Sequence, residues 1–336
     1  MHHRNPITGK IEDFIVKTGI ILTTLLKQIA FSGAIALLLA AQPAHADEIH
    51  RVLEKRIESL LPEKAEWALV AIDMESGENI AEFGNSLGEQ LIPASLTKLL
   101  TTGAVLDHVD RGGAVETMVT VGTKSVRKGK RMVKRSVRRP VAIRDQGQIL
   151  TLLRDMNVHS RNTTAQNLAD FLGERHFGPP GSRVKGARAV CDFLNGFDLP
   201  TGEAVIADGC GLKRENRVTA RFMARYLHQV AEKPWFGTFR ETLPRPGFEG
   251  TVKRIGYTDQ RFRVKTGSLN DVFALAGYGV DLRGKDFSFA FIVNVKNRRT
   301  SDHKHSRGEI MRLLAAGALQ QDLIVGDLVS SSTDWH

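Results

Sequence analysis

The stretch LIPASLTKLLTTGAVLDHV, residues 91–109, decides the fold class. Its apolar residues from Leu96 onward recur at helical spacing, and Pro93 lies just ahead of them. Ser95 therefore stands at the start of a predicted helix, with Lys98 three residues later on the same face. A serine hydroxyl is a poor nucleophile until a neighbouring base accepts its proton. The pair is a candidate nucleophile and base.

Ser-x-x-Lys is a weak signal by itself, because it occurs four times in the chain. The other three copies fall in a basic stretch, after Pro-Pro-Gly and in a polar segment near the end: Ser125, Ser182 and Ser301. For the fragment alone, a capping serine and a surface lysine are the default explanation. The interpretation depends on the rest of the chain.

A second element, Lys265-Thr266-Gly267, ends the predicted strand 261–265. Its cation and hydroxyls, with Ser268, could hold a terminal carboxylate beside a sheet edge, and the glycine leaves room for a ligand. An ordinary strand end with a turn glycine is the alternative. The same tripeptide at Lys17 lies in a predicted leader and is set aside.

A third element, Ser160-Arg161-Asn162, lies between two predicted helices, 148–158 and 163–173. Ser-x-Asn recurs at Ser268, so the spacing alone means little. The order and context of the three elements carry more weight: a helix start, a helix-helix break and a late strand. This set resembles the one used by penicillin-binding proteins and serine β-lactamases.

A longer stretch resembles one family of that group. Residues 208–219 read DGCGLKRENRVT, similar to the Asp-Gly-Ser-Gly-Leu-Ser-Arg-x-Asn-Arg signature of the D-alanyl-D-alanine carboxypeptidase/endopeptidase family, a group of low-molecular-mass penicillin-binding proteins. Glu249-Gly250-Thr251 also resembles that family. The similarity runs from about residue 67 to residue 295.

Two departures from the family pattern stand out. Cys210 and Lys213 replace the usual serines. The connection from Ser95 to Ser160 is also far shorter than the family's, which normally carries inserted domains. The chain therefore resembles a stripped-down catalytic core. We expect Asp208 and Asn216 to support the turn rather than to take part in chemistry.

The resemblance implies a role for each candidate. Ser95 would attack the carbonyl between two D-alanines, Lys98 would take its proton, and Ser160 would relay a proton to the leaving amine. The substrate would be held by Asn162 at its amide and by Lys265, Thr266 and Ser268 at its terminal carboxylate. Backbone N–H groups of Ser95 and Ser268 would form the oxyanion hole. Burial and the like charge of Lys265 would lower the pKa of Lys98. No cofactor and no metal is implied.

The apolar pattern predicts an α/β fold of the α+β kind. Strands are expected at 67–74, 79–83, 272–280 and 287–295 beside the one at 261–265, and helices at 48–61 and 307–320 beside those already described. Strands from both chain ends would then share one sheet with helices on its faces. The resemblance implies a central antiparallel sheet of the penicillin-binding protein and serine β-lactamase type.

The N-terminus reads as an export signal. Residues 29–41 form an apolar run after Lys27, and Ala44-His45-Ala46 is a small-x-small site, so cleavage is expected after Ala46. An uncleaved membrane anchor is the alternative. We expect a leader at 1–46, a catalytic domain at 47–325 and a tail at 326–336, with the mature protein in the periplasm.

The charge of +10 is concentrated in the stretch 124–144. Interleaved apolar residues there favour a basic hairpin at least as much as an arm for nucleic acid. Nucleic acid also conflicts with export, and no recognition module is present. We expect the insertion 124–144 to meet anionic membrane or wall polymer instead.

Cysteine and histidine usage argues against zinc. The two cysteines, Cys191 and Cys210, form no zinc-type cluster, and no His-Glu-x-x-His helix occurs. Whether the two cysteines are free or paired is left open, since an export compartment permits a disulfide.

The function expected from the resemblance is a serine-type D-Ala-D-Ala carboxypeptidase or endopeptidase acting on peptidoglycan stem peptides, with β-lactams as covalent inhibitors. A β-lactamase is one alternative. Its class A form has a base in a Glu-x-x-Leu-Asn segment, and Cys191 and Thr266 stand at that position before the two Leu-Asn pairs here. A non-catalytic cell-wall binding protein of the same fold is another.

Overall fold

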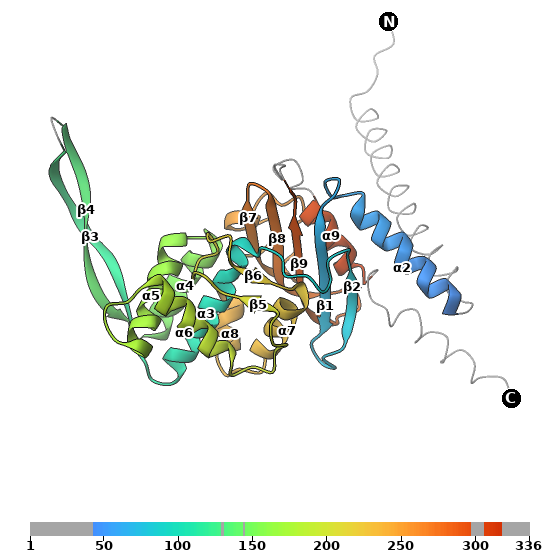
Figure 1. Ribbon diagram of the computed structural model, residues 1–336, viewed down its shortest axis with the longest axis horizontal. Helices are drawn as coiled ribbons and strands as arrows, with labels where there is room; N and C mark the ends of the chain where they lie inside the picture. The colour runs from blue at the N-terminus through green and yellow to red at the C-terminus, as the bar shows by residue number, and fades with distance from the viewer. Residues whose placement is uncertain (1–42, 129–130, 144, 297–305, 318–336) are drawn as a thin grey trace, which may run out of the picture. The chain divides into compact units, whose positions relative to one another are not determined.

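A five-stranded antiparallel sheet forms the centre of the fold (Figure 1). The computed structural model describes residues 43–128, 131–143, 145–296 and 306–317. In spatial order β2-β1-β9-β8-β7, the strands are β2 Asn79–Phe83, β1 Glu66–Asp73, β9 Asp286–Asn294, β8 Val272–Val280 and β7 Arg263–Leu269. Strands from both chain ends meet where β1 pairs with β9. The predicted fold class is confirmed.

Two aspartates close the turns that connect neighbouring strands. Asp73 Oδ1 accepts the backbone N–H groups of Glu75 and Ser76 at 2.9 and 2.8 Å, between β1 and β2. Asp281 Oδ1 accepts those of Arg283 and Lys285 at 2.8 and 2.9 Å, between β8 and β9. Such side-chain caps satisfy backbone donors that a strand partner cannot reach.

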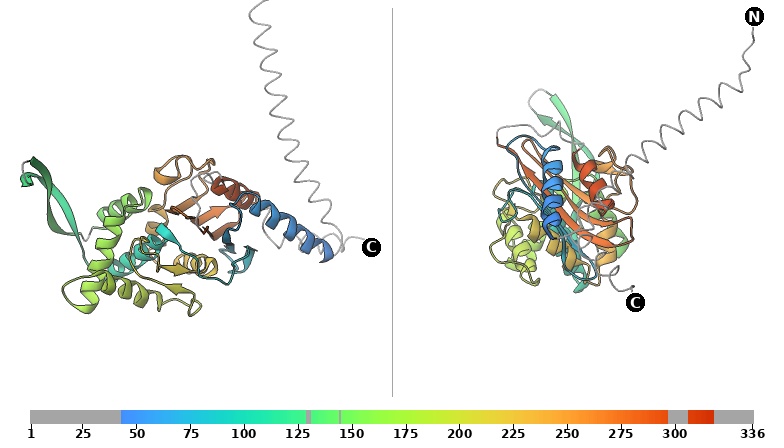
Figure 2. Two further views of the ribbon diagram at one scale, coloured as in Figure 1. Left: turned by 45° about the horizontal axis from the view of Figure 1, so that its top comes forward. Right: turned by 90° about the vertical axis from the view of Figure 1, so that its right-hand side faces the viewer.

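The two faces of the sheet carry different side chains, because successive residues of a strand point to opposite sides. On β8 the small Ala274 and Ala276 share a face with Tyr278, whose hydroxyl donates to the Leu227 carbonyl of helix α7 at 2.9 Å. The aromatic Phe273 lies on the other face, under the Arg307 guanidinium of helix α9. Helices α7 and α9 therefore cover opposite faces, as two further views also show (Figure 2).

The helices cluster mostly between β2 and β7 in the chain. Their bounds are α2 Pro43–Glu58, α3 Thr97–Asp110, α4 Gln146–Val158, α5 Asn162–Phe177, α6 Arg183–Leu194, α7 Ala220–Val230, α8 Phe236–Glu241 and α9 Ser306–Ala315, with 3-10 turns η1 Ala94–Leu96 and η2 Gly250–Val252. The contact pattern separates a unit of residues 54–320, which holds the sheet, from 1–53 with 321–336.

Several elements go beyond what the sequence predicted. Helices α6, α7 and α8 fall in a stretch for which no element was expected. A short strand pair, β5 Ala204–Val205 and β6 Arg217–Val218, is also new. Finally, β7 runs on to Leu269, so the prediction that Lys265 ends its strand is wrong. Pairing with β8 continues through Ser268 opposite Phe273.

The basic stretch lies on a long hairpin, β3 Val115–Lys128 and β4 Arg131–Ile143. Its strands pair from Val115 opposite Ile143 to Lys128 opposite Arg131, so the basic residues concentrate toward the turn. The hairpin extends away from the helices (Figure 1), and Glu116 near its base forms an ion pair with Arg175 of α5. The hairpin is thus longer than the predicted insertion.

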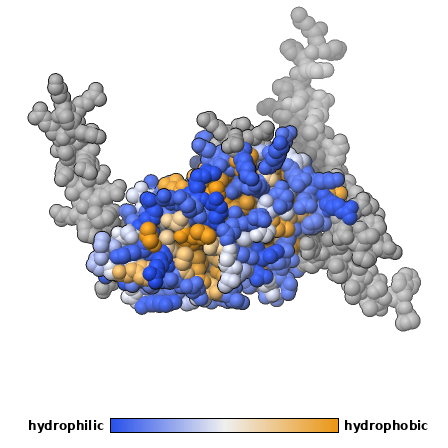
Figure 3. Space-filling model, viewed as in Figure 1, coloured by the Kyte–Doolittle hydropathy of each residue, from blue (hydrophilic) through white to orange (hydrophobic). Residues whose placement is uncertain are grey.

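The export signal lies mostly outside the described residues, and its predicted cleavage position after Ala46 falls in the first turn of α2. Within the described part of the chain, no helix is long and apolar enough to span a bilayer. Figure 3 shows hydrophilic residues over most of one face, with smaller apolar areas between them.

Helix α3 is buried over nearly its whole length and needs a glycine where other helices cross it. A Cβ on Gly103 would lie 2.1 Å from the Tyr226 hydroxyl and 3.0 Å from Phe193. That hydroxyl is itself fixed, because it donates to the Leu99 carbonyl at 3.1 Å.

We therefore predict that Gly103→Ala lowers the free energy of unfolding. Overpacking costs about 1–3 kcal/mol, whereas the better helix propensity of alanine returns only about 1 kcal/mol. Urea denaturation of Gly103→Ala, Tyr226→Phe and the double variant measures how much stability the added methyl group costs and how much of that cost comes from the Tyr226 hydroxyl. Removing the hydroxyl should recover part of the loss, so strictly additive effects in the double variant would contradict this explanation.

Candidate active site

Ser95 lies in the 3-10 turn that runs directly into α3. The residue before it, Ala94, has a left-handed backbone with φ of 48°. Such a conformation is unfavourable for a residue with a side chain and persists where surrounding contacts enforce it. Ser95 is partly exposed, whereas Lys98, one turn further on, is fully buried.

The Lys98 amine contacts three oxygen atoms. Its Nζ lies 2.9 Å from Ser95 Oγ, 2.7 Å from Asn162 Oδ1 and 2.5 Å from the Cys210 carbonyl oxygen. The amide and carbonyl oxygens can only accept hydrogen bonds. A neutral amine would donate its two N–H groups to them, and its lone pair would remain for the proton of Ser95. The geometry therefore suits a neutral Lys98 acting as a base.

Burial favours that neutral form. Loss of solvation lowers the pKa of Lys98 to about 8, although the charges of Cys210 and Asp208 act in the opposite direction. Burial also places the pKa of Lys265 well below its usual value, and the charges of Lys98 and Arg307 add to this shift. The like charges of Lys98 and Lys265 repel each other, and this repulsion contributes to the lowered pKa of Lys265.

The turn that holds the Cys210 carbonyl is organised by a buried carboxylate. Asp208 accepts the backbone N–H groups of all four residues from 210 to 213, at distances between 2.6 and 3.1 Å. Asn216 Nδ2 donates to the same carboxylate at 3.0 Å. These contacts fit the supporting role expected for Asp208 and Asn216. Both cysteines are free thiols.

The turn also presses against the nucleophile. Gly211 has φ of 83°, and a Cβ there would lie 1.8 Å from the Ala94 carbonyl oxygen. Only glycine fits both the backbone conformation and the space. The turn at 208–213 therefore supports Lys98 and the Ser95 backbone together.

The opposite side of the site joins Ser160 to Lys265. Lys265 Nζ donates to Ser160 Oγ at 3.0 Å and to the Thr266 carbonyl at 2.8 Å. Ser160, like Ala94, has a left-handed backbone, with φ of 54°. Its hydroxyl proton is left available for a ligand, which suits a proton relay.

Lys265, Thr266 and Ser268 form the carboxylate side of the site, the part predicted to hold the substrate's terminal carboxylate. It includes a cation that the sequence did not predict. Arg307 Nη2 donates to the Gly267 carbonyl at 2.7 Å and to Ser268 Oγ at 2.8 Å. Burial lowers the pKa of Arg307 to about 10. Arg307 comes from α9, some forty residues after Lys265, and a lone arginine in an amphipathic helix carries no sequence signal for such a role.

The structure brings the predicted residues together in two linked groups. Ser95, Lys98 and Asn162 form one, while Ser160, Lys265, Thr266 and Ser268 form the other. Asn162 begins α5, two residues after Ser160, and so connects the groups. In the described part of the chain, no three His, Cys, Asp or Glu side chains gather as a metal site would require.

The sheet, the flanking helices and this arrangement of serine and lysine side chains define a protein of the penicillin-binding protein and serine β-lactamase class. Residues 133–316 match the D-Ala-D-Ala carboxypeptidase 3 (S13) family, over more than half of the chain. The chain belongs to this family. The matched region begins after Ser95 and Lys98, so these two residues rest on the sequence motif and on the geometry above.

Curated relatives carry the same family name. The D-alanyl-D-alanine carboxypeptidase DacB of Haemophilus influenzae is 29% identical over 181 residues, which are 50% of this chain and 38% of that protein. The D-alanyl-D-alanine carboxypeptidase of an Actinomadura species is 33% identical over 145 residues, 40% of this chain and 26% of that protein. The chain thus aligns with well under half of each relative's length.

Solved structures share the fold. Penicillin-binding protein 4 from Haemophilus influenzae superposes with a TM-score of 0.61 and 15% identity, covering 78% of this chain and 99% of that one. A class A β-lactamase from Bacteroides cellulosilyticus gives a TM-score of 0.54 and 17% identity, covering 84% and 99%. These likenesses confirm the fold and leave the choice of activity to the site.

The pKa of Lys98 predicts how acylation of Ser95 depends on pH. Only the neutral amine can accept the serine proton, so the rate should rise with pH up to about 8 and level off above it. Between pH 8 and pH 6 the neutral fraction falls about fiftyfold. The second-order rate constant for acylation by a penicillin, measured from pH 6 to 9, checks this. A rate that is flat or falls with pH would show that Lys98 is not the base.

Proposed function

We propose that the protein is a serine-type D-Ala-D-Ala carboxypeptidase or endopeptidase that acts on peptidoglycan stem peptides through an acyl-enzyme on Ser95. The observation that carries this proposal is the environment of Lys98. Two oxygens that can only accept hydrogen bonds occupy its N–H groups, which leaves its lone pair for Ser95. Its depressed pKa allows a neutral fraction near physiological pH.

The reaction would proceed in two halves. Ser95 Oγ attacks the carbonyl carbon between the D-alanines as Lys98 takes its proton. Ser160 gives its hydroxyl proton to the leaving amine and recovers a proton from Lys98. The peptide C–N bond breaks, D-alanine leaves, and an ester remains on Ser95. Water then attacks the ester and regenerates the serine.

The substrate contacts follow from donors that remain free. Asn162 Oδ1 accepts a hydrogen bond from Lys98, so its Nδ2 can donate to the substrate's amide carbonyl. Lys265, Thr266 and Ser268 would hold the terminal carboxylate of the leaving D-alanine. A peptide cross-link placed in the same way would make the enzyme an endopeptidase.

β-Lactams are proposed as covalent inhibitors on the same serine. They carry a carboxylate beside a strained amide, as the peptide does beside its scissile bond. A solved Haemophilus influenzae penicillin-binding protein 4 with this fold is complexed with a β-lactam.

Labelled penicillin tests the nucleophile directly. Mass spectrometry of the wild-type protein should show one adduct, on the peptide that contains Ser95, because the Lys98 amine lies 2.9 Å from the Ser95 hydroxyl and can take its proton. Ser95→Ala should show none. A folded wild-type protein without any adduct would refute the proposed activity and favour a non-catalytic wall-binding protein. Rapid turnover of nitrocefin would favour a β-lactamase.

We also propose that the protein works in the periplasm after export. The apolar run 29–41 and the small-x-small site at Ala44 support this. N-terminal sequencing of the exported protein would show a start at Asp47, whereas an intact Met1 would rule out the cleavage.

The basic hairpin is proposed to contact the anionic envelope, membrane lipid or wall polymer. Its basic residues lie toward the turn of a hairpin that extends away from the helices (Figure 1), so envelope contact there would not interfere with catalysis. Removing residues 124–139 should release the protein from envelope fractions at low salt and leave penicillin acylation unchanged. Unchanged association of the shortened protein would contradict the proposed contact.

A further inference from the structure

Thr251 adds a hydroxyl beside the carboxylate side of the site. It lies in the 3-10 turn η2, with its Oγ1 2.8 Å from Thr266 Oγ1. Thr266 is buried, whereas Thr251 is exposed. The exposed hydroxyl therefore neighbours a predicted substrate-binding residue and can be reached from solvent.

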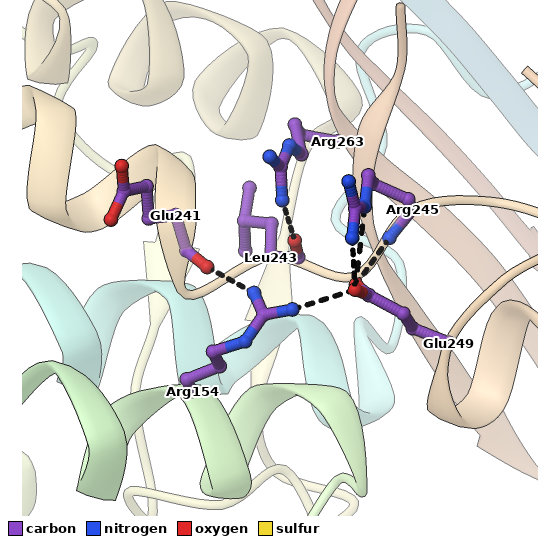
Figure 4. Close-up of polar contacts among 6 residues, drawn as sticks. All are labelled: Arg154, Glu241, Leu243, Arg245, Glu249 and Arg263. Atoms are coloured by element: carbon purple, nitrogen blue, oxygen red, sulfur yellow. Dashed lines mark hydrogen bonds and ion pairs between the residues drawn. The ribbon is translucent and has the colours of Figure 1, made fainter. Parts of the chain in front are cut away.

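An ionic clamp fixes the start of this turn (Figure 4). Glu249 Oε1 accepts from Arg154 Nη2 at 2.7 Å and from Arg245 Nη2 at 2.9 Å. Its Oε2 accepts the backbone N–H of Arg245 at 3.0 Å. Arg154 also donates to the Glu241 carbonyl at 2.5 Å. The Glu249 carboxylate thus connects η2 to α4, and Arg154 connects α4 to the end of α8.

The turn also rests against the segment that carries Ser160. Gly250 has φ of 46°, and a Cβ there would lie 2.0 Å from the Val158 carbonyl oxygen. Val158 is the last residue of α4, two residues before Ser160. Thr251 is therefore placed by contacts with both sides of the site, β7 and the α4 end, rather than by its own loop alone.

The charges beside these hydroxyls favour an anion. Lys265 and Arg307 are buried, and neither forms an ion pair with any carboxylate of the described residues. The Arg307 Nε has no hydrogen-bond partner there either. A buried cation without a counter-ion is costly, and an anionic ligand relieves that cost.

We propose that Thr251 is a further hydroxyl of the subsite for the substrate's terminal carboxylate, and that Glu249 is the positioning residue that holds it there. Thr266 Oγ1 donates to Thr251 Oγ1, so the Thr251 hydroxyl can donate to the carboxylate itself. If both hydroxyls turn, Thr251 donates to Thr266, which then donates to the carboxylate. This inference rests on the proposed function. It predicts that the enzyme prefers a free carboxylate next to the scissile bond over the same peptide ending in an amide.

The test compares kcat/KM for an acyl-D-Ala-D-Ala peptide and its C-terminal amide. Thr251→Val keeps the shape and removes the hydroxyl, so it should reduce the preference for the free carboxylate about tenfold. Thr251→Ser restores the hydroxyl and should restore most of the preference. Thr201→Val, at an exposed threonine in another turn of the chain, is the matched control and should behave as wild type.

Glu249→Gln tests the positioning. It should raise KM for the free-carboxylate peptide more than for the amide, with kcat less affected, because the turn loosens while Ser95 and Lys98 keep their contacts. A melting curve checks the fold. If this variant does not fold, Arg245→Gln removes part of the clamp at a more exposed residue.

The outcomes separate the two proposals. If the wild type is not acylated by penicillin and cleaves neither peptide, the proposed function fails and this inference fails with it. If the wild type is active but Thr251→Val keeps the wild-type preference, or lowers both rates equally, Thr251 does not bind the carboxylate. If Glu249→Gln leaves the KM ratio unchanged, the clamp is only structural.

Discussion

The fully buried amine of Lys98 is the constraint on which the site depends. A lysine removed from water must either lose its proton or find hydrogen-bond partners. Here the lowered pKa of Lys98 favours the neutral amine, and three oxygen atoms lie within hydrogen-bond distance of it. Its partners come from three separate segments: Ser95 in η1, Asn162 at the start of α5, and the Cys210 carbonyl. These segments must converge for the amine to be satisfied, so the same contacts that make a base also fix the arrangement of the helices.

The cost of this convergence is visible in the backbone. Ala94 and Ser160, which lie beside the two halves of the site, both have left-handed conformations. Gly211 and Gly250 fit where any side chain would collide with a neighbouring carbonyl oxygen. Backbone strain of this kind persists where surrounding structure enforces it, and the Asp208 turn and the Glu249 clamp supply that enforcement.

The sequence predicted the strands, several helices and the residues that meet at the site, because local periodicity and short motifs encode them. It did not predict the partners of those residues. The Cys210 contact is made by a backbone carbonyl, which any residue could supply, and Arg307 and Thr251 reach the site from distant segments. Helix α7 could have been predicted, since Phe222, Met223, Tyr226, Leu227 and Val230 repeat at helical spacing. The sequence also placed the end of β7 too early, at Lys265. The strand continues to Leu269 because it pairs with β8, and no local pattern specifies that pairing.

The order of the strands has a consequence for how the chain folds. β9, among the last elements along the chain, lies between β1 and β8 at the centre of the sheet. Until residue 294 has been made, β1 can pair only with β2, and the sheet remains open along that edge. Contacts between distant segments form slowly, so the central sheet is completed only after nearly the whole stretch from β1 to β9 has been made.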